Sequence, residues 1–388
     1  MFRAYTSCTK YYLPKARVMA KTLKKFHPDW PLHLIFSDSL PENFNLKDEP
    51  FDDLILIEEL GIPNFKQWLF KHTIVELCTA VKGTALVRLL HMPDTQGVFY
   101  LDPDLAIFND LGNLTELLAQ YDILLTPHLL HPEDEPGLIS GNEVVTTLAH
   151  GIYNLGFLGV AATQTGRKFA KWWEKRLLWF CQDNVPEGLF TDQRWCDFIP
   201  SFFETYHIIR DPGYNVATWN IRYRPITRDE QAQYLAGGHP LRFYHFTGYD
   251  AGYNYENLLK QFSKGYPAAF EIWDEYASLL TNNGHEDASL DHWEYGSFDN
   301  GRKILKSMRV AYRNSHQLQE KYKDPFDCNG PDAFINWCED NGLFSEDTEI
   351  EAAEITQLKD ELDAIKNSVI WKITKPLRLA QKLMRRIK

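Results

Sequence analysis

The sequence has few of the features that mark disulfide-stabilised, membrane-spanning or nucleic-acid-binding proteins. Its six cysteines are scattered, without zinc-ligand spacing or a dense disulfide pattern, which favours a reducing cytoplasm. No apolar run is long enough to span a bilayer, and MFRAYTSCTK leads directly into an expected strand rather than a signal segment. The formal net charge of -12 argues against an extended nucleic-acid surface, because phosphate-backbone binding needs a basic stripe. We therefore expect a cytoplasmic protein, with binding of a small anion left open.

The chain does contain enough apolar material for a large core. At 388 residues and 44% hydrophobic content it is long enough for two or more domains. Short apolar runs alternate with helical stretches, beginning with FRAYT, LPKARVMAKTLKKF and LHLIF. This pattern predicts an α/β fold, with a mainly parallel sheet covered by helices on both faces. Strand signals stop after about residue 255, so a helical appendage is expected over residues 256–347.

Two aspartates directly follow one of the predicted strands. In FYLDPDLAIF, Asp102 and Asp104 are two positions apart on extended backbone, so their side chains can converge on one cation. Mg²⁺ and Mn²⁺ take such oxygen ligands and keep positions open for substrate phosphates. A solvated turn is the alternative, whereas an EF-hand is excluded because the three residues after Asp104 are apolar. The strand end favours the ligand site, since open α/β sheets bind ligands there.

Four motifs in order carry a resemblance to a known enzyme family. They are FYLDPD, YNLGF at 153–157, TDQ at 191–193 and YHFTG at 244–248. Over roughly residues 1–255 the chain resembles GT-A fold glycosyltransferases, most of all the retaining family 8 group, and it is similar to bacterial cell-surface polysaccharide enzymes. The resemblance implies a Rossmann-like nucleotide-sugar domain over 1–255. It also implies metal-dependent, retaining transfer of a sugar from a nucleotide-diphosphate donor, with UDP expected, to a glycan, lipid-linked or protein acceptor.

The resemblance assigns a metal site. Asp102, Asp104 and His245 become the ligands of Mn²⁺ or Mg²⁺, with Asp102 also near the donor sugar or ribose. An imidazole in an otherwise oxygen-rich shell favours Mn²⁺. Taken alone, a histidine between Tyr244 and Phe246 on a strand is more often a core or surface residue.

It also assigns residues around the donor sugar. Asn154 and Gly156 match the segment beside that sugar, although a glycine there also suits an ordinary β-bulge. Asp192 and Gln193 match the pair that faces the anomeric carbon, and Asp192 also suits a helix N-cap. Asn154, Asp192 and Gln193 are therefore the candidate catalytic residues. No strong carboxylate base is obvious at the attacking side, which suits a front-face reaction with retention.

The candidates for nucleotide binding include one helix cation. Lys82 is expected to contact the donor, and Arg88 is the other residue that could have this role. For either residue the alternative is an ordinary solvated cation on a helix. The other candidates lie at strand ends or in the fourth motif: Ala4, Tyr5, Thr6, Asp38 and Gly248. The chain departs from the family after His245, where TGYDAGYNY replaces the usual run with a phosphate-binding lysine.

Other possibilities remain open at this stage. In GYNVATWNI, Asn215, Trp219 and Asn220 are further candidates for the donor or acceptor site, with core packing as the alternative for Trp219. A metal-dependent nucleotide-sugar hydrolase and a non-catalytic sugar- or nucleotide-binding protein are the other function classes.

Residues 348–388 form a third region with segregated charge. Asp and Glu are frequent over 346–363, whereas 366–388 carry eight Lys or Arg residues and no acid. This predicts an amphipathic tail that binds an anionic membrane, or a coiled coil that makes a homo-oligomer, with a solvated coil as the third interpretation. The location expected is then cytoplasmic, or peripheral on the inner face of the cytoplasmic membrane.

Overall fold

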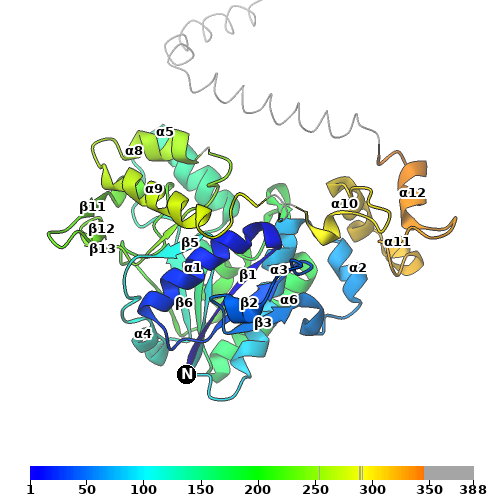
Figure 1. Cartoon of the computed structure of the whole chain (residues 1–388), viewed down its shortest axis with the longest axis horizontal. Helices are drawn as coiled ribbons and strands as arrows, with labels where there is room; N and C mark the ends of the chain where they lie inside the picture. Colours follow the sequence, from blue (N-terminus) through cyan, green and yellow to red (C-terminus); the bar gives the residue numbers. More distant parts are fainter. Residues whose placement is uncertain (253, 288–289, 291, 345–388) are drawn as a thin grey trace, which may run out of the picture. The chain divides into compact units, whose positions relative to one another are not determined.

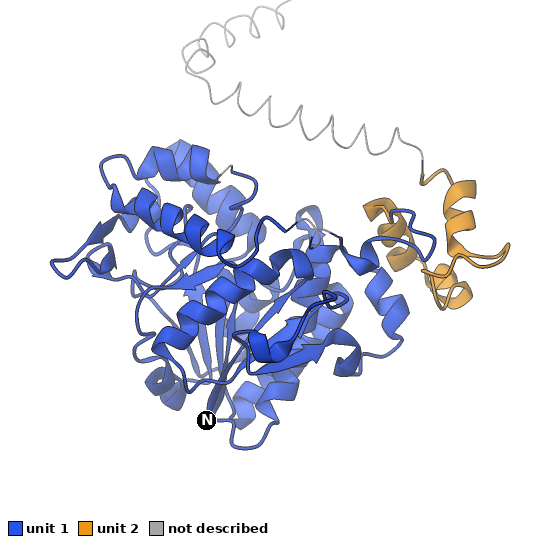
Figure 2. Ribbon diagram, viewed as in Figure 1, with its two compact units in different colours: residues 1–303 blue, residues 304–388 orange. Residues whose placement is uncertain are grey.

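The computed structural model describes residues 1–252, 254–287, 290 and 292–344. These residues belong to two compact units, residues 1–303 and residues from 304 onward (Figure 2). The predicted tail and coiled coil over 348–388 lie outside the described residues. No helix of the described part is long and apolar enough to cross a bilayer.

A seven-stranded sheet forms the centre of the first unit (Figure 1). Its strand order is β10-β6-β7-β4-β1-β2-β3, and every neighbouring pair is parallel except the two made by β7. The strands are β1 (Phe2–Cys8), β2 (Leu32–Phe36), β3 (Asp53–Leu56), β4 (Gly97–Leu101), β6 (Ile123–Pro127), β7 (Tyr153–Ala161) and β10 (Tyr206–Ile208).

Short strands and the helices complete the described chain. Smaller sheets contain β5 (Leu105–Ile107) with β14 (Phe243–His245), β8 (Asp183–Asn184) with β9 (Leu189–Phe190), and β11 (Ile226–Arg228), β12 (Tyr234–Ala236) and β13 (His239–Pro240). The α-helices of the first unit are α1 (Leu13–Phe26), α2 (Phe65–Phe70), α3 (Ile74–Leu90), α4 (Leu114–Gln120), α5 (Pro136–Leu138), α6 (Gln164–Phe180), α7 (Ile199–Phe202), α8 (Lys260–Phe262) and α9 (Ala268–Thr281). Those of the second are α10 (Lys306–Asn314), α11 (His316–Lys321) and α12 (Phe334–Asp340).

Helices cover both faces of the large sheet, which explains why its strands are apolar without alternation. On β1, Ala4 and Cys8 join the core cluster that includes Leu13 and Ala16 of α1. Tyr5 points the other way and donates a hydrogen bond of 3.0 Å to the Lys82 carbonyl of α3. The predicted α/β class, with a largely parallel sheet and a helical C-terminal region, is confirmed.

Helices α3 and α6 lie unusually close on one of these faces. A Cβ on Gly83 would stand 2.6 Å from the Cα of Glu174, so only glycine permits this approach. Helix α3 begins at a capping box in which Thr73 accepts from Glu76 N–H and Glu76 caps Thr73 in return. This cap marks the start of α3 and separates it from α2, which ends at Phe70. By setting the start of α3, the capping box also sets the position of Lys82, which lies next to Gly83 and whose side chain points toward the sheet.

The first compact unit extends beyond residue 255, to residue 303. Leu259 and helix α9 belong to the same core cluster as Val216, Tyr244 and Phe246, so residues beyond 255 complete the core of the first unit. Aromatic side chains make this packing extensive, as in the stacked pair of Phe246 and Tyr276. The assignment of separate roles to residues 1–255 and 256–347 stays a prediction.

Candidate functional site

Two aspartates and a histidine meet at the end of β4. Asp102 follows β4 directly, and its N–H donates to the Gly156 carbonyl of β7 at 2.9 Å. Asp104 precedes β5, which pairs antiparallel with β14 so that His245 lies opposite Leu105. His245 Nε2 consequently lies 3.1 Å from Asp104 Oδ1 and 3.8 Å from Asp102 Oδ2. One ligand atom from each of the three residues lies within 4.8 Å of the others.

The imidazole of His245 is oriented by an asparagine. His245 Nδ1 lies 3.3 Å from Asn215 Oδ1. Asn215 Nδ2 donates to Thr126 Oγ1 at 2.9 Å and to Asn154 Oδ1 at 3.0 Å, so its oxygen must be the atom that faces the ring. Nδ1 therefore carries a hydrogen, which leaves Nε2 as the nitrogen that can give its lone pair to a metal ion beside the carboxylates, the arrangement that metal-ligating histidines use. Asn215 adopts a φ of 51°, which asparagine tolerates better than most residues.

Gly156 leaves the space that this imidazole occupies. A Cβ there would lie 2.6 Å from His245 Cε1 and 2.7 Å from Nδ1. The imidazole therefore requires a glycine here. The pairing of β6 with β7 is also irregular at this point, between the pairs Leu125–Leu158 and Pro127–Tyr153, so the bulge interpretation stays compatible with the structure. Its predicted place beside a donor sugar stays a prediction.

The charges of the site are arranged for a cation. Burial alone would raise the pKa of the Asp104 carboxyl, but His245 outweighs it and holds that pKa below the ordinary value. Burial would likewise lower the pKa of His245, but Asp104 raises it above the ordinary value. Two carboxylates and an imidazole with an aimed Nε2 fit a divalent cation such as Mn²⁺.

Lys82 of α3 lies between two carboxylates of the same site. Its Nζ is 2.9 Å from Asp192 Oδ2 and 3.2 Å from Asp102 Oδ1, and it lies over the Tyr100 ring at 4.1 Å. Burial lowers the pKa of Lys82, yet the two aspartates outweigh it and hold that pKa well above the ordinary value. Arg88, the competing candidate, donates instead to the Glu59 carbonyl. Of the two, Lys82 is the cation that the fold brings to the aspartates.

Asp192 and Gln193 are held by contacts from three other segments. The Asp192 carbonyl accepts from the indole N–H of Trp173 at 3.1 Å, and its carboxylate faces Lys82. The helical turn that follows has Gln193 at its N-cap, without a side-chain cap, so the N-cap interpretation of Asp192 is wrong. Gln193 Oε1 accepts from Leu155 N–H at 3.3 Å, and Nε2 donates to the His150 carbonyl at 2.9 Å.

Lys82, Asp192, Gln193 and the three candidate metal ligands border one cavity of about 550 Å³. The predicted site residues that line it are Lys82, Asp102, Asp104, Asn154, Asp192, Gln193 and His245. The first strand continues two residues beyond the predicted FRAYT, and these residues, Ser7 and Cys8, line the cavity together with Thr9 and Tyr12 that follow the strand. Ala4, Tyr5 and Thr6 are buried within that strand and do not line the cavity. Trp219, a weaker candidate, does line it, with its ring 5.5 Å from that of His245.

Two other predicted residues organise loops around the site. Asp38 accepts from the N–H groups of Lys10, Ser39 and Glu294, and it does not line the cavity. Gly248 has a φ of 66°, and a Cβ there would lie 2.8 Å from Asn254 Nδ2. The glycine thus shapes the turn that brings Asn254 to the cavity wall.

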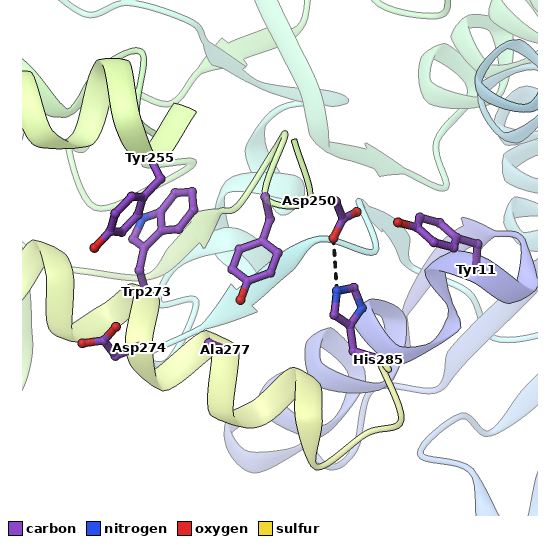
Figure 3. Close-up of a pocket in the computed structure, with 8 residues that line it drawn as sticks. Tyr11, Asp250, Tyr255, Trp273, Asp274, Ala277 and His285 are labelled. Atoms are coloured by element: carbon purple, nitrogen blue, oxygen red, sulfur yellow. Dashed lines mark ion pairs between the residues drawn. The ribbon is translucent and has the colours of Figure 1, made fainter. Parts of the chain in front are cut away.

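A second pocket of about 480 Å³ borders the loop that follows β14 and contains Gly248 (Figure 3). Tyr11, Tyr255 and Trp273 line it together with Asp250 and His285, among others (Figure 3). Asp250 forms ion pairs with His285, at 3.1 Å, and with Lys15 of α1. Asp250 therefore anchors the loop that follows β14 to α1.

Comparisons with known proteins give distant relatives. No family model matches the chain. Two Bacillus subtilis (strain 168) proteins, both described as uncharacterized, are similar to it in sequence. YfnF is 28% identical over 254 residues, which cover 64% of this chain and 82% of YfnF. YfnD is 23% identical over 253 residues, which cover 64% and 78%.

The similar solved structures are glycosyltransferases. The galactosyltransferase LgtC in complex with donor and acceptor sugar analogs is 14% identical, with a TM-score of 0.42, and covers 73% of this chain and 96% of its own. Mouse xyloside xylosyltransferase 1 is 15% identical, with a TM-score of 0.38, and covers 63% and 97%.

Proposed function

We propose that this protein is a metal-dependent glycosyltransferase that moves a sugar from a nucleotide-diphosphate donor to an acceptor. One observation carries the proposal: Asp102, Asp104 and His245 converge on the wall of a cavity that also holds a buried lysine. Asp102 and Asp104 with His245 would hold Mn²⁺ or Mg²⁺, and such an ion supplies Lewis-acid stabilisation of a leaving diphosphate. UDP is the proposed nucleotide.

Lys82 contributes a fixed positive charge to the same region. Its pKa is held well above the ordinary value, so it is charged at neutral pH, and it is already desolvated and positioned by Asp102 and Asp192. A charge placed in this way stabilises negative charge that develops on the donor phosphates without reorganisation.

The chemistry on the sugar side supports retention of the anomeric configuration. Asp192 is the carboxylate beside Gln193. Burial raises its pKa above the ordinary value, but its Oδ2 already accepts a hydrogen bond from Lys82 at 2.9 Å, so that oxygen is not positioned to take a proton from an acceptor. The Gln193 amide has both polar atoms bonded to backbone and is a poor base. An inverting reaction needs a positioned carboxylate base. We therefore assign Asp192 and Asn154 to binding sugar hydroxyls and Gln193 to shaping the floor beside the anomeric carbon.

The test is incubation of the full chain with a panel of nucleotide sugars and Mn²⁺, with and without glycan, lipid-linked and protein acceptors. The donor is chosen first as the nucleotide sugar that raises the melting temperature most. Acceptor-dependent sugar transfer supports the proposal. Cleavage with water alone would identify a hydrolase, and binding without turnover a non-catalytic binding protein. Proton NMR of the first product decides the stereochemistry, and an inverted linkage contradicts retention.

A further inference from the structure

An unusual run of aromatic side chains lies on the surface of the first unit. Six rings form a continuous chain in which each centroid is within 6.5 Å of the next: Trp179, Phe180, Trp195, Phe198, Phe202 and Trp172. We call them the aromatic face. Trp179 is 67% exposed and Phe202 52% exposed, far more than large aromatic side chains usually are. Contiguous exposed apolar surface of this kind marks an interaction site.

Cations accompany these rings on helix α6. The helix carries Arg167, Lys168, Lys171, Lys175 and Arg176 against one acid, in a chain whose net charge is -12. That acid, Glu174, is paired with Lys171 at 3.1 Å. Lys168 and Lys175 are exposed, and Arg176 lies over the Trp172 ring at 5.1 Å. The aromatic face and a local positive charge therefore occupy the same helix.

We propose that the aromatic face docks on an anionic lipid surface. Tryptophan and phenylalanine insert at the boundary between headgroups and acyl chains, while lysine and arginine are attracted to anionic headgroups. A protein partner fits less well, because lysine is depleted in protein–protein interfaces. The surface is separate from the basic tail predicted over 366–388, which lies outside the described residues.

Exposed apolar residues continue from the aromatic face toward the rim of the cavity. Arg194 donates to the Leu148 carbonyl at 2.9 Å, and Asp197 accepts from Ile152 N–H at 2.8 Å, so the segment beside the face is fixed to it. That segment exposes Val144, Val145, Leu148 and Ile152. Its Thr146 lines the cavity. Docking would thus bring the rim of the cavity near the lipid surface, where a lipid-borne molecule can reach it.

The experiment is sedimentation of the full chain with vesicles of equal parts phosphatidylglycerol and phosphatidylcholine, compared with pure phosphatidylcholine. We expect binding to the anionic vesicles that weakens with salt. The double variant Trp179→Ala/Phe202→Ala should bind at least about tenfold less, because two interfacial rings are lost. The matched control is Tyr223→Ala/Tyr266→Ala, which removes two other exposed aromatic side chains and should bind as the unchanged chain does.

A second pair of variants tests the charge. Lys168→Glu/Lys175→Glu should weaken binding to the anionic vesicles, whereas Lys47→Glu/Lys264→Glu, which alters exposed lysines elsewhere, should have a much smaller effect. Vesicle binding that is unchanged by Trp179→Ala/Phe202→Ala, or no binding to either vesicle, would overturn the proposal. So would a dimer that dissociates on that substitution, because a second copy would then cover the face. None of these outcomes depends on sugar transfer.

Discussion

The cavity and the aromatic face depart from the usual distribution of residues in opposite ways. In the cavity, Lys82, Asp192 and His245 are charged or titratable side chains that are at most 4% exposed. On the aromatic face, Trp179 and Phe202 are apolar side chains that are more than half exposed. Charged side chains normally lie at the surface, because removing them from water is costly. Large apolar side chains normally lie in the core, because exposing them to water is costly.

The two departures have different costs, and the difference indicates how each region is maintained. A buried charge is tolerated only with partners, and the cavity supplies them as Lys82 with Asp192 and Asp104 with His245. Exposed rings need no partner in the folded chain, so they can be removed without unfolding it. Substitutions in the cavity should therefore change both stability and chemistry, whereas those on the aromatic face should change binding alone.

The largest effect should come from the metal ligands. Asp102→Asn or Asp104→Asn removes a charged ligand, and we expect metal-dependent donor turnover to fall by at least about 10³-fold. Turnover measured across a Mn²⁺ titration checks this. The matched control is Asp53→Asn, because Asp53 also contacts a histidine, His33, at 2.9 Å but lies away from the cavity. Near-normal turnover in either ligand variant would remove the metal assignment.

Lys82→Met should reduce stability as well as activity. The substitution leaves Asp192 buried without its cation, a loss that typically costs about 3–5 kcal/mol in the free energy of unfolding. Denaturant unfolding measures it. Adding Asp192→Asn should restore much of the stability but not the turnover, because the carboxylate that needs the cation is gone. A single variant as stable as the unchanged chain would mean that the pair is solvated.

Gly156→Ala tests the support of His245 without removing a ligand. The added methyl would collide with the imidazole, so Mn²⁺ affinity should fall by about 10–100-fold, as for loss of other groups that orient ligands. Calorimetric titration with Mn²⁺ alone is the measurement. Gly137→Ala is the control, because a Cβ there meets no atom within 4 Å. Equal affinities in the two variants would show that His245 does not depend on Gly156.

The smallest effect should be that of the aromatic face on the fold. Trp179→Ala/Phe202→Ala should change the free energy of unfolding by no more than about 0.5 kcal/mol, as exposed substitutions usually do. Turnover of a soluble acceptor should also be unchanged. Thermal unfolding and a soluble assay check both. A large loss of stability would show that these rings are part of the core. The aromatic face would then contribute to the stability of the fold, as the cavity does.

The α/β fold class was accessible from the sequence because it depends on local pattern. Apolar runs alternating with helical periodicity specify strands and helices, and strands that are apolar throughout specify a sheet covered on both faces. The strand end at Asp102 and Asp104 followed from the same pattern. Local signals compete at Thr73, where a capping box starts a new helix within a continuous helical pattern.

The partners of the site residues could not be read from spacing. Lys82 pairs with Asp192 across 110 positions, and His245 is oriented by Asn215 through an amide whose direction is set by Asn154 and Thr126. Tyr12, which follows β1, also lines the cavity beside these residues. Such contacts depend on how the strands and helices assemble. The chemical type of a residue is read at its own position, whereas its neighbours in space come from distant parts of the sequence.

The sequence by itself determined the kinds of residue available: two carboxylates after a strand, a motif histidine, and helix α6 rich in tryptophan and lysine. Only the tertiary structure decided which charges are buried together and which rings are left in solvent. The reason is physical. Desolvation and hydration act on accessible surface, and the accessible surface of a side chain is set by neighbours that are distant in the sequence.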